Sequence, residues 1–166
     1  METERLFLRA WMSGDFADLY EYSKLEGIGM ADTQKTLDGY ISGGQNFAVV
    51  LKERNKVIGS VGFGDVTLDD DAYKHLRKKG VGYCLSREYW GRGIMTEAVR
   101  AVIDWLFDNT DTELIFCGCS DENTRSRRVI EKCNFTFIGT ETFSDGGEII
   151  NGRNYVLLRE NYCTKV

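Results

Sequence analysis

Apolar and polar residues follow two different periods along this chain. Residues 3–9 (TERLFLR) alternate between the two kinds, which predicts a β-strand with Leu6 and Leu8 on one face. Between residues 94 and 109 the apolar positions recur at helical spacing, as in an amphipathic helix. That helix is predicted to bury one stripe, made of Met95, Ala98, Val99, Val102, Ile103 and Leu106.

The same patterns predict the other elements. Strands are expected over residues 47–51, 57–63, 81–85, 114–119, 136–143 and 155–159. Further helices are expected after Ser13, a residue type that caps helices, and over residues 33–42 and 123–133. Asn151 and Gly152 predict the turn of a C-terminal hairpin. Strands followed by helices predict an α/β fold, a mixed sheet with helices on both faces.

Length and composition fit one ordinary globular domain. The chain has 166 residues, 42% hydrophobic and 28% charged, so residues 1–166 are expected to form a single domain. The polar segment 69–79 predicts a solvated loop. The net charge, 21 − 26 = −5, argues against a nucleic-acid partner, because such proteins gather Lys and Arg. An acidic balance suits cationic partners such as amines.

The cysteines and the hydropathy of the chain favour a cytoplasmic protein. The sequence has five cysteines, one histidine and no CxxC motif, which predicts reduced thiols and no metal site. No apolar run has the length of a signal peptide or a membrane span, so no membrane association is expected.

The most informative segment is the predicted strand–turn–helix over residues 81–98. Gly91 and Gly93 lie in the turn, where the absence of a Cβ lets the backbone approach a ligand. The N-terminus of the following helix offers unpaired N–H groups and partial positive charge, a geometry that binds a pyrophosphate. The alternative is a plain corner between a strand and a helix. The dinucleotide motif GxGxxG and the nucleotide-triphosphate phosphate loop are both absent.

Two motifs resemble a known family. Residues 89–98 (YWGRGIMTEA) resemble the acetyl-coenzyme A pyrophosphate loop of the GNAT superfamily of N-acetyltransferases. Residues 123–135 (NTRSRRVIEKCNF) resemble the second conserved helix of the branch that acetylates N-termini of ribosomal proteins. The resemblance covers nearly the whole chain. It implies a mostly antiparallel, twisted sheet that splays after the fourth strand, acetyl-coenzyme A as co-substrate and an amine as acceptor.

The chain departs from the family pattern at three positions. Glu88 lies where many members have Gln or Arg, and Asn134 replaces a glycine, although Asn also tolerates a left-handed backbone. Ile130 occupies the position of a tyrosine that protonates the departing thiolate in many members. In this branch, that departure points to Ser126 as the catalytic residue.

Ser126 also stands out by its position. It shares one helix face with Val129, Ile130 and Cys133, and a hydroxyl on an apolar face needs a partner. The alternative is a bond to a backbone carbonyl of the helix itself. Asn123 is a good N-cap, and the resemblance adds a contact to the cofactor.

The resemblance implies a set of cofactor-binding residues. They are Cys84, Leu85, Gly91, Arg92, Gly93, Ile94, Met95, Thr96 and Asn123. Arg128 is added by its chemistry, as the first choice among the cations Arg125, Arg127, Arg128 and Lys132 to reach the cofactor phosphates; the alternative is that these four form a solvated face. The general base stays unassigned, with Glu88, Asp121 and Glu122 as candidates by chemistry alone.

The acceptor and the assembly are the open questions. A protein N-terminus, a small amine such as a polyamine, an aminoglycoside or an amino acid, and a non-catalytic coenzyme A sensor all remain compatible with the sequence. The resemblance and the edge strands of the C-terminal hairpin favour a weak homodimer.

Overall fold

The computed structural model describes residues 1–145 and 148–163, and their contacts form two compact units. One unit, called unit 1 here, comprises Met1–Phe63 and Tyr83–Val102; the other, unit 2, comprises Gly64–Gly82 and the chain from Ile103 onward. Two strands and a helix described below each contribute residues to both units. The single domain expected from the length of the chain stays a prediction.

The fold is α/β, as predicted. Its strands form one sheet with the order β1-β2-β3-β4-β5-β7-β6, in which β4 and β5 are parallel and β1–β2, β2–β3, β5–β7 and β6–β7 are antiparallel. The strands are β1 (Leu6–Ala10), β2 (Asn46–Leu51), β3 (Lys56–Asp65), β4 (Lys78–Leu85), β5 (Leu114–Ser120), β6 (Thr136–Asp145) and β7 (Glu148–Leu158). The helices are α1 (Phe16–Ser23), α2 (Met30–Gly43), α3 (Ile94–Asn109), α4 (Thr124–Lys132) and α5 (Arg159–Cys163).

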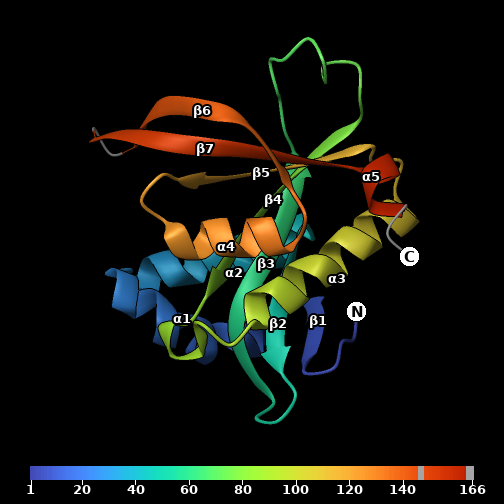
Figure 1. Cartoon of the computed structure of the whole chain (residues 1–166). Coiled ribbons are helices and arrows are strands. Elements are labelled where there is room, and N and C mark those ends of the chain that lie inside the picture. The colour runs from blue at the N-terminus through green and yellow to red at the C-terminus, as the bar shows by residue number, and fades with distance from the viewer. Residues whose placement is uncertain (146–147, 164–166) are drawn as a thin grey trace. The chain divides into compact units, whose positions relative to one another are not determined.

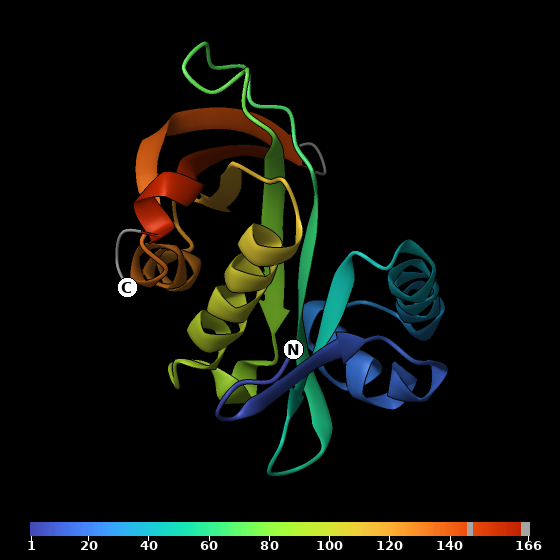
Figure 2. The same ribbon diagram turned by 90° about the vertical axis from the view of Figure 1, so that its right-hand side faces the viewer.

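Unit 1 packs α1 and α2 against its strands. Figure 2 shows the two helices side by side, next to β1 and β2. A buried cluster holds them there, formed by Trp11, Leu19, Tyr22, Leu37, Ala48, Val50 and Val57. The helix predicted over residues 33–42 is longer than expected and already begins at Met30.

The start of α1 differs from the prediction. Ser13 does not cap the helix; it lies in a 3₁₀ turn over Ser13–Asp15, and Asp15 occupies the N-cap position. The carboxylate of Asp15 accepts a hydrogen bond from the Met12 N–H and forms a bidentate pair with Arg9. The ion pair with the preceding strand therefore fixes where the helix begins.

Helix α3 matches its prediction in bounds and in its buried face. All six residues of the predicted stripe are buried, and four of them, Ala98, Val102, Ile103 and Leu106, are 0% exposed. A period of 3.6 in the sequence was sufficient here, because apolar residues at that spacing lie on one face of a helix.

Unit 2 carries the long ribbon of β6 and β7, which Figure 1 shows with α4 below it. The hairpin turn predicted at Asn151–Gly152 is wrong. Both residues lie inside β7, paired with Thr142 and Glu141, and neither has the positive φ that a type I′ turn requires. The ladder continues to the pair Asp145–Glu148, and residues 146–147 lie outside the described part. Helix α5 was not predicted.

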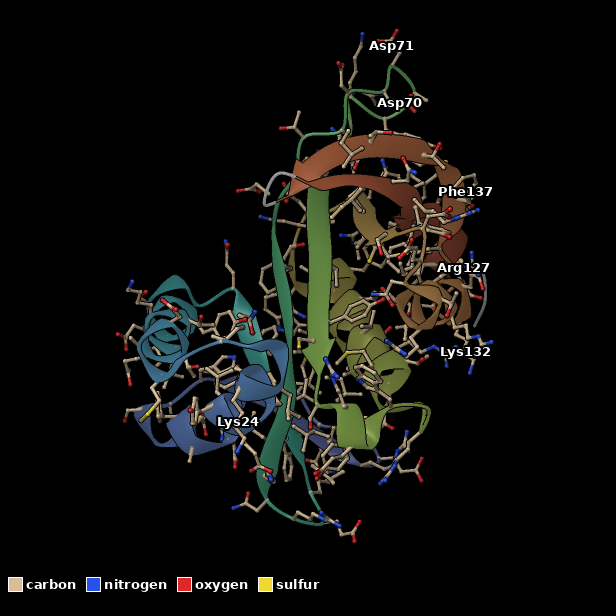
Figure 3. The ribbon with its side chains drawn as sticks, turned by 90° about the vertical axis from the view of Figure 1, so that its left-hand side faces the viewer. Lys24, Asp70, Asp71, Arg127, Lys132 and Phe137 are labelled. Atoms are coloured by element: carbon tan, nitrogen blue, oxygen red, sulfur yellow. The ribbon has the colours of Figure 1, made fainter. Side chains whose placement is uncertain are left out.

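Strand β4 begins three residues earlier than predicted, at Lys78. Its parallel ladder with β5 covers three pairs, from Lys78–Leu114 to Gly80–Phe116, whereas β4 itself continues to Leu85. The polar segment before β4 is a loop, as expected, and Figure 3 shows Asp70 and Asp71 at its tip.

Candidate active site

The segment between β4 and α3 is held at the end of β4 by two hydrogen bonds. The Ser86 N–H donates to the Ile58 carbonyl at 2.8 Å, which ties the end of β4 to β3. The indole Nε1 of Trp90 donates to the Leu85 carbonyl at 2.8 Å. The indole therefore fixes the backbone where the chain leaves the strand.

Gly91 and Gly93 both need to be glycine for conformational reasons. Their φ angles are +75° and +73°, in the left-handed region that side chains with a Cβ rarely adopt. A Cβ built on Gly91 would meet nothing within 4 Å, and one on Gly93 would meet only the Arg5 guanidinium at 3.7 Å. The turn therefore exposes its backbone to open space, as a ligand-binding loop requires.

Helix α3 begins directly after this turn. Ile94 and Met95 have buried side chains, and Thr96 is 9% exposed, so these residues can serve a ligand mainly through their backbone. The first N–H groups of a helix have no partner four residues earlier, and the helix dipole adds partial positive charge. The turn and the first turn of α3 together form a candidate anion site.

A network around Glu97 fixes this site, and sequence analysis missed it. The Glu97 carboxylate accepts hydrogen bonds from the Thr3 hydroxyl, the Arg5 N–H and the Arg5 guanidinium. The same guanidinium donates to the Arg92 carbonyl at 2.9 Å, within the turn. Burial acts to raise the pKa of Glu97, but these hydrogen bonds and the Arg5 charge outweigh it and hold that pKa below its ordinary value.

Two arginines of the turn lie over aromatic rings. The Arg92 guanidinium is 5.5 Å from the centre of the Tyr89 ring, and the Arg87 guanidinium is 5.7 Å from that of Trp90. Tyr89 is buried, and its hydroxyl accepts a long hydrogen bond from Arg54. The aromatic rings thus hold positive charge beside the turn, which favours an anionic ligand.

The end of β4 lies very close to β3. A Cβ on Gly59 would lie 2.4 Å from the Cys84 carbonyl oxygen and 3.1 Å from the Leu85 Cα. Only glycine permits this approach. Cys84 and Leu85, both predicted to bind the cofactor, are therefore positioned by the backbone of the neighbouring strand.

In unit 2, the predicted site residues Asn123 and Ser126 make local hydrogen bonds at the start of α4. Asn123 caps the helix, because its side chain accepts a hydrogen bond from the Ser126 N–H at 3.0 Å. Ser126 is half-buried and shares a side-chain hydrogen bond with Cys119 of β5. Burial raises the pKa of the Cys119 thiol, while Arg127, Arg153 and this bond act to lower it. Asn134 has a φ of +65°, which confirms the left-handed backbone expected at the helix end.

The charged candidates of unit 2 lie at the surface. Arg128 is exposed, and Figure 3 shows Arg127 and Lys132 directed away from the body of α4. Of the three candidate bases, Asp121 is paired with Arg153 at 2.8 Å, and Glu88 and Glu122 are exposed. No one of them is singled out by its surroundings.

The predicted site residues thus fall into two groups. Unit 1 holds Cys84 and Leu85 at the end of β4, and the stretch from Gly91 to Thr96 in the following turn and the start of α3. Unit 2 holds Asn123, Ser126 and Arg128 on α4. Among the described residues, no cluster of His, Cys, Asp or Glu is arranged to hold a metal ion. No helix in the same part of the chain is long and apolar enough to cross a membrane.

Comparison with known families identifies this architecture. A model described as an acetyltransferase (GNAT) domain matches residues 5–136. The chain therefore belongs to the GNAT acetyltransferase family, as the two sequence motifs predicted. An uncharacterized N-acetyltransferase, p20, from Bacillus licheniformis is 28% identical over 119 residues, which cover 70% of this chain and 64% of that protein. The match thus spans less than two thirds of that relative's length.

Solved structures share the fold over nearly the whole chain. A GNAT-family acetyltransferase from Bacillus anthracis aligns with a TM-score of 0.84 at 24% identity, covering 96% of this chain and 98% of that one. The ribosomal-protein-S5-alanine acetyltransferase from Vibrio fischeri aligns with a TM-score of 0.75 at 21% identity, covering 98% of this chain and 97% of that one. A chimera of the spermidine N-acetyltransferase from Vibrio cholerae aligns with a TM-score of 0.78 at 19% identity, covering 98% of this chain and 100% of that one.

Proposed function

We propose that the protein is an N-acetyltransferase that moves an acetyl group from acetyl-coenzyme A to a primary amine, with the N-terminus of a protein, such as a ribosomal protein, as the acceptor. The observation that carries this proposal is the turn over residues 91–93, with two left-handed glycines directly before the N-terminus of α3. Such a turn binds a pyrophosphate through backbone N–H groups, and the family of the chain uses acetyl-coenzyme A.

The oxyanion, the leaving thiolate and the cofactor phosphates each have a proposed partner in the chain. The unprotonated amine attacks the acetyl carbonyl carbon and forms the C–N bond, which gives a tetrahedral oxyanion. The carbonyl then re-forms as the C–S bond breaks, the nitrogen loses a proton to a base, and the coenzyme A thiolate takes up a proton. The Leu85 N–H, at the end of β4, is the proposed donor to the oxyanion. Ser126 is the proposed donor to the leaving thiolate, a role taken from the family resemblance. Arg128 and the turn are the proposed partners of the cofactor phosphates.

Two other functions have support of their own. Acetylation of a small amine is favoured by the likeness to the spermidine enzyme chimera and by the acidic net charge. A coenzyme A sensor without activity is favoured by Ile130 at the position of the family's tyrosine. Both are alternatives to the proposed acetylation of protein N-termini, which we favour.

Calorimetry with acetyl-coenzyme A tests the cofactor assignment. Gly93→Val should abolish binding, because a branched side chain at a φ of +73° distorts the turn and fills the space beside it. Gly44→Val is the matched control. Gly44 ends α2 with a φ of +63° and open space around it, so this variant carries similar backbone strain outside the turn.

The proposal predicts that Gly44→Val binds acetyl-coenzyme A like the wild type, and that only Gly93→Val loses binding. Acetyl-coenzyme A should also raise the Tm of the wild-type protein, since it binds the folded state alone. Unchanged affinity in a folded Gly93→Val variant would contradict the pyrophosphate assignment.

A further inference from the structure

Three hydroxyl groups gather inside unit 1, each from a different element. Tyr22 comes from α1, Tyr40 from α2 and Ser60 from β3. Tyr22 is 7% exposed and Ser60 is 3% exposed, whereas Tyr40 is half-buried with its ring 5.2 Å from that of Trp11. The surrounding cluster is otherwise apolar.

An irregularity in β3 turns Ser60 toward these helices. Val49 pairs with Gly59 and Val50 pairs with Val57, so Ile58 has no partner in β2. In a regular strand Val57 and Ser60 would lie on opposite faces, but one extra residue between them places both on the same face. Val57 belongs to the cluster that contains Tyr22, and Ser60 accordingly lies near both tyrosine hydroxyls.

The Tyr22 hydroxyl is buried and makes no hydrogen bond of normal geometry to the described residues. Folded proteins pair nearly all such groups, because burying an unpaired hydroxyl costs free energy. The Ser60 hydroxyl lies close enough to interact with the hydroxyls of both Tyr22 and Tyr40. Because no such contact of Tyr22 has normal hydrogen-bond geometry, its hydroxyl keeps hydrogen-bonding capacity for a ligand.

Both tyrosines stay uncharged near neutral pH. Burial raises the pKa of Tyr22 and of Tyr40, and the nearby Cys84 thiol adds to the rise in both. The same proximity places the hydroxyls beside the end of β4, where Cys84 and Leu85 lie. They can donate a hydrogen bond there or accept one, but they cannot offer a charge.

The carboxylates of α1 and of its N-cap, Asp15, are engaged elsewhere. Asp15 pairs with Arg9, and Asp18 accepts a hydrogen bond from the Val57 N–H at 2.9 Å. Glu21 pairs with Lys56 at 2.8 Å. A second ammonium group of a polyamine would need such a carboxylate when it leaves water. The cluster instead suits an uncharged polar group.

We infer that the Tyr22 hydroxyl, supported by Tyr40 and Ser60, binds an uncharged carbonyl or hydroxyl group of the acceptor next to its reacting amine. A peptide N-terminus carries such a group in its first peptide bond, whereas spermidine does not. The inference rests on the proposed acetyl transfer, and it names Tyr22 as the residue that selects peptide acceptors.

Tyr22→Phe tests this, because it removes one hydroxyl and keeps the ring. Acetylation of a panel of short peptides with different N-terminal residues should show a KM for the peptide about tenfold higher than wild type, the effect of one lost hydrogen bond. Affinity for acetyl-coenzyme A should be unchanged, and the Tm without ligand should be equal or higher, since the hydroxyl makes no hydrogen bond of normal geometry to the described residues. Tyr20→Phe, on the same helix but half-exposed, is the matched control and should behave like wild type.

Other outcomes separate this inference from the proposed function. An unchanged peptide KM in Tyr22→Phe, or a panel in which spermidine reacts and no peptide does, would overturn the inference and leave acetyl transfer intact. A lowered Tm with an unchanged KM would show that the hydroxyl is structural. Binding of acetyl-coenzyme A without reaction at any amine would also overturn it. Failure of the wild type to bind acetyl-coenzyme A would overturn the proposed function itself.

Discussion

At the scale of single residues, Ser126 carries the most specific expectation. The structure places its hydroxyl in a hydrogen bond with Cys119, on a helix whose N-cap, Asn123, fixes the Ser126 backbone. The side chain is therefore oriented before any cofactor binds. Its chemical role stays a prediction from the resemblance, because the local structure serves a positioning role equally well.

Ser126→Ala should lower kcat by about 10²–10⁴ with nearly intact affinity for acetyl-coenzyme A, if the hydroxyl donates to the leaving thiolate. Steady-state kinetics beside wild type is the measurement, and Thr124→Ala, two residues earlier and exposed, is the control. A rise in KM for acetyl-coenzyme A at constant kcat would instead assign Ser126 to cofactor positioning. A kcat within about threefold of wild type, under roughly 0.7 kcal/mol of barrier, rules out the donor role.

Gly59 is the residue on which the end of β4 depends. Gly59→Ala should destabilise the protein by about 1–3 kcal/mol, as overpacking does, because the new Cβ would lie 2.4 Å from the Cys84 carbonyl. Gly82→Ala is the control in β4, where a Cβ meets nothing within 4 Å. Urea unfolding of both variants measures the difference. Equal stability of Gly59→Ala and wild type would mean that β3 and β4 separate without cost.

At the scale of elements, the first turn of α3 is tied to the N-terminal segment by Glu97. This carboxylate accepts hydrogen bonds from Thr3 and Arg5, and the Arg5 guanidinium also donates to the Arg92 carbonyl in the turn. The network links the stability of the fold with the shape of the candidate cofactor site.

The lowered pKa of Glu97 gives a pH dependence with a definite sign. Because the pKa of Glu97 in the folded protein lies below the ordinary value of 4.5, its ionised carboxylate stabilises the folded state at pH values above 4.5. This contribution is lost as the pH falls through the pKa that Glu97 has in the folded protein. Glu97→Gln should therefore be less stable than wild type near neutral pH, and the difference should shrink at a pH below about 4. Chemical unfolding across this range measures it. A difference that stays constant with pH would contradict the assigned role of the charge.

The elements also show which features local sequence can predict. The stripe of α3 and the cap at Asn123 depend on residues within a few positions of each other, and both were predicted correctly. The Arg5–Glu97 pair joins residues 92 positions apart, and the irregularity at Ile58 depends on pairing between strands. Neither has a local signal. At Asn151–Gly152 a strong local signal gave the wrong turn, because the longer ladder to Asp145–Glu148 forms instead.

At the scale of the whole molecule, assembly is the first expectation. The outer strand of unit 2 is β6, and it presents Phe137, 45% exposed, with Arg153 over its ring. An edge strand with an exposed aromatic residue favours association. We expect a weak homodimer, which light scattering over a range of protein concentrations would show. A monomer mass at the highest concentration would contradict it.

Catalysis is the second expectation, and it contains the central claim. The most direct measurement is the release of coenzyme A thiol from acetyl-coenzyme A in the presence of an amine panel of peptides, spermidine, an aminoglycoside and amino acids, with mass spectrometry of the products. The account predicts thiol release that depends on a peptide amine, an acetylated peptide N-terminus as product, and loss of both in Gly93→Val. Binding of acetyl-coenzyme A without amine-dependent release from any acceptor would contradict the account and favour a sensor.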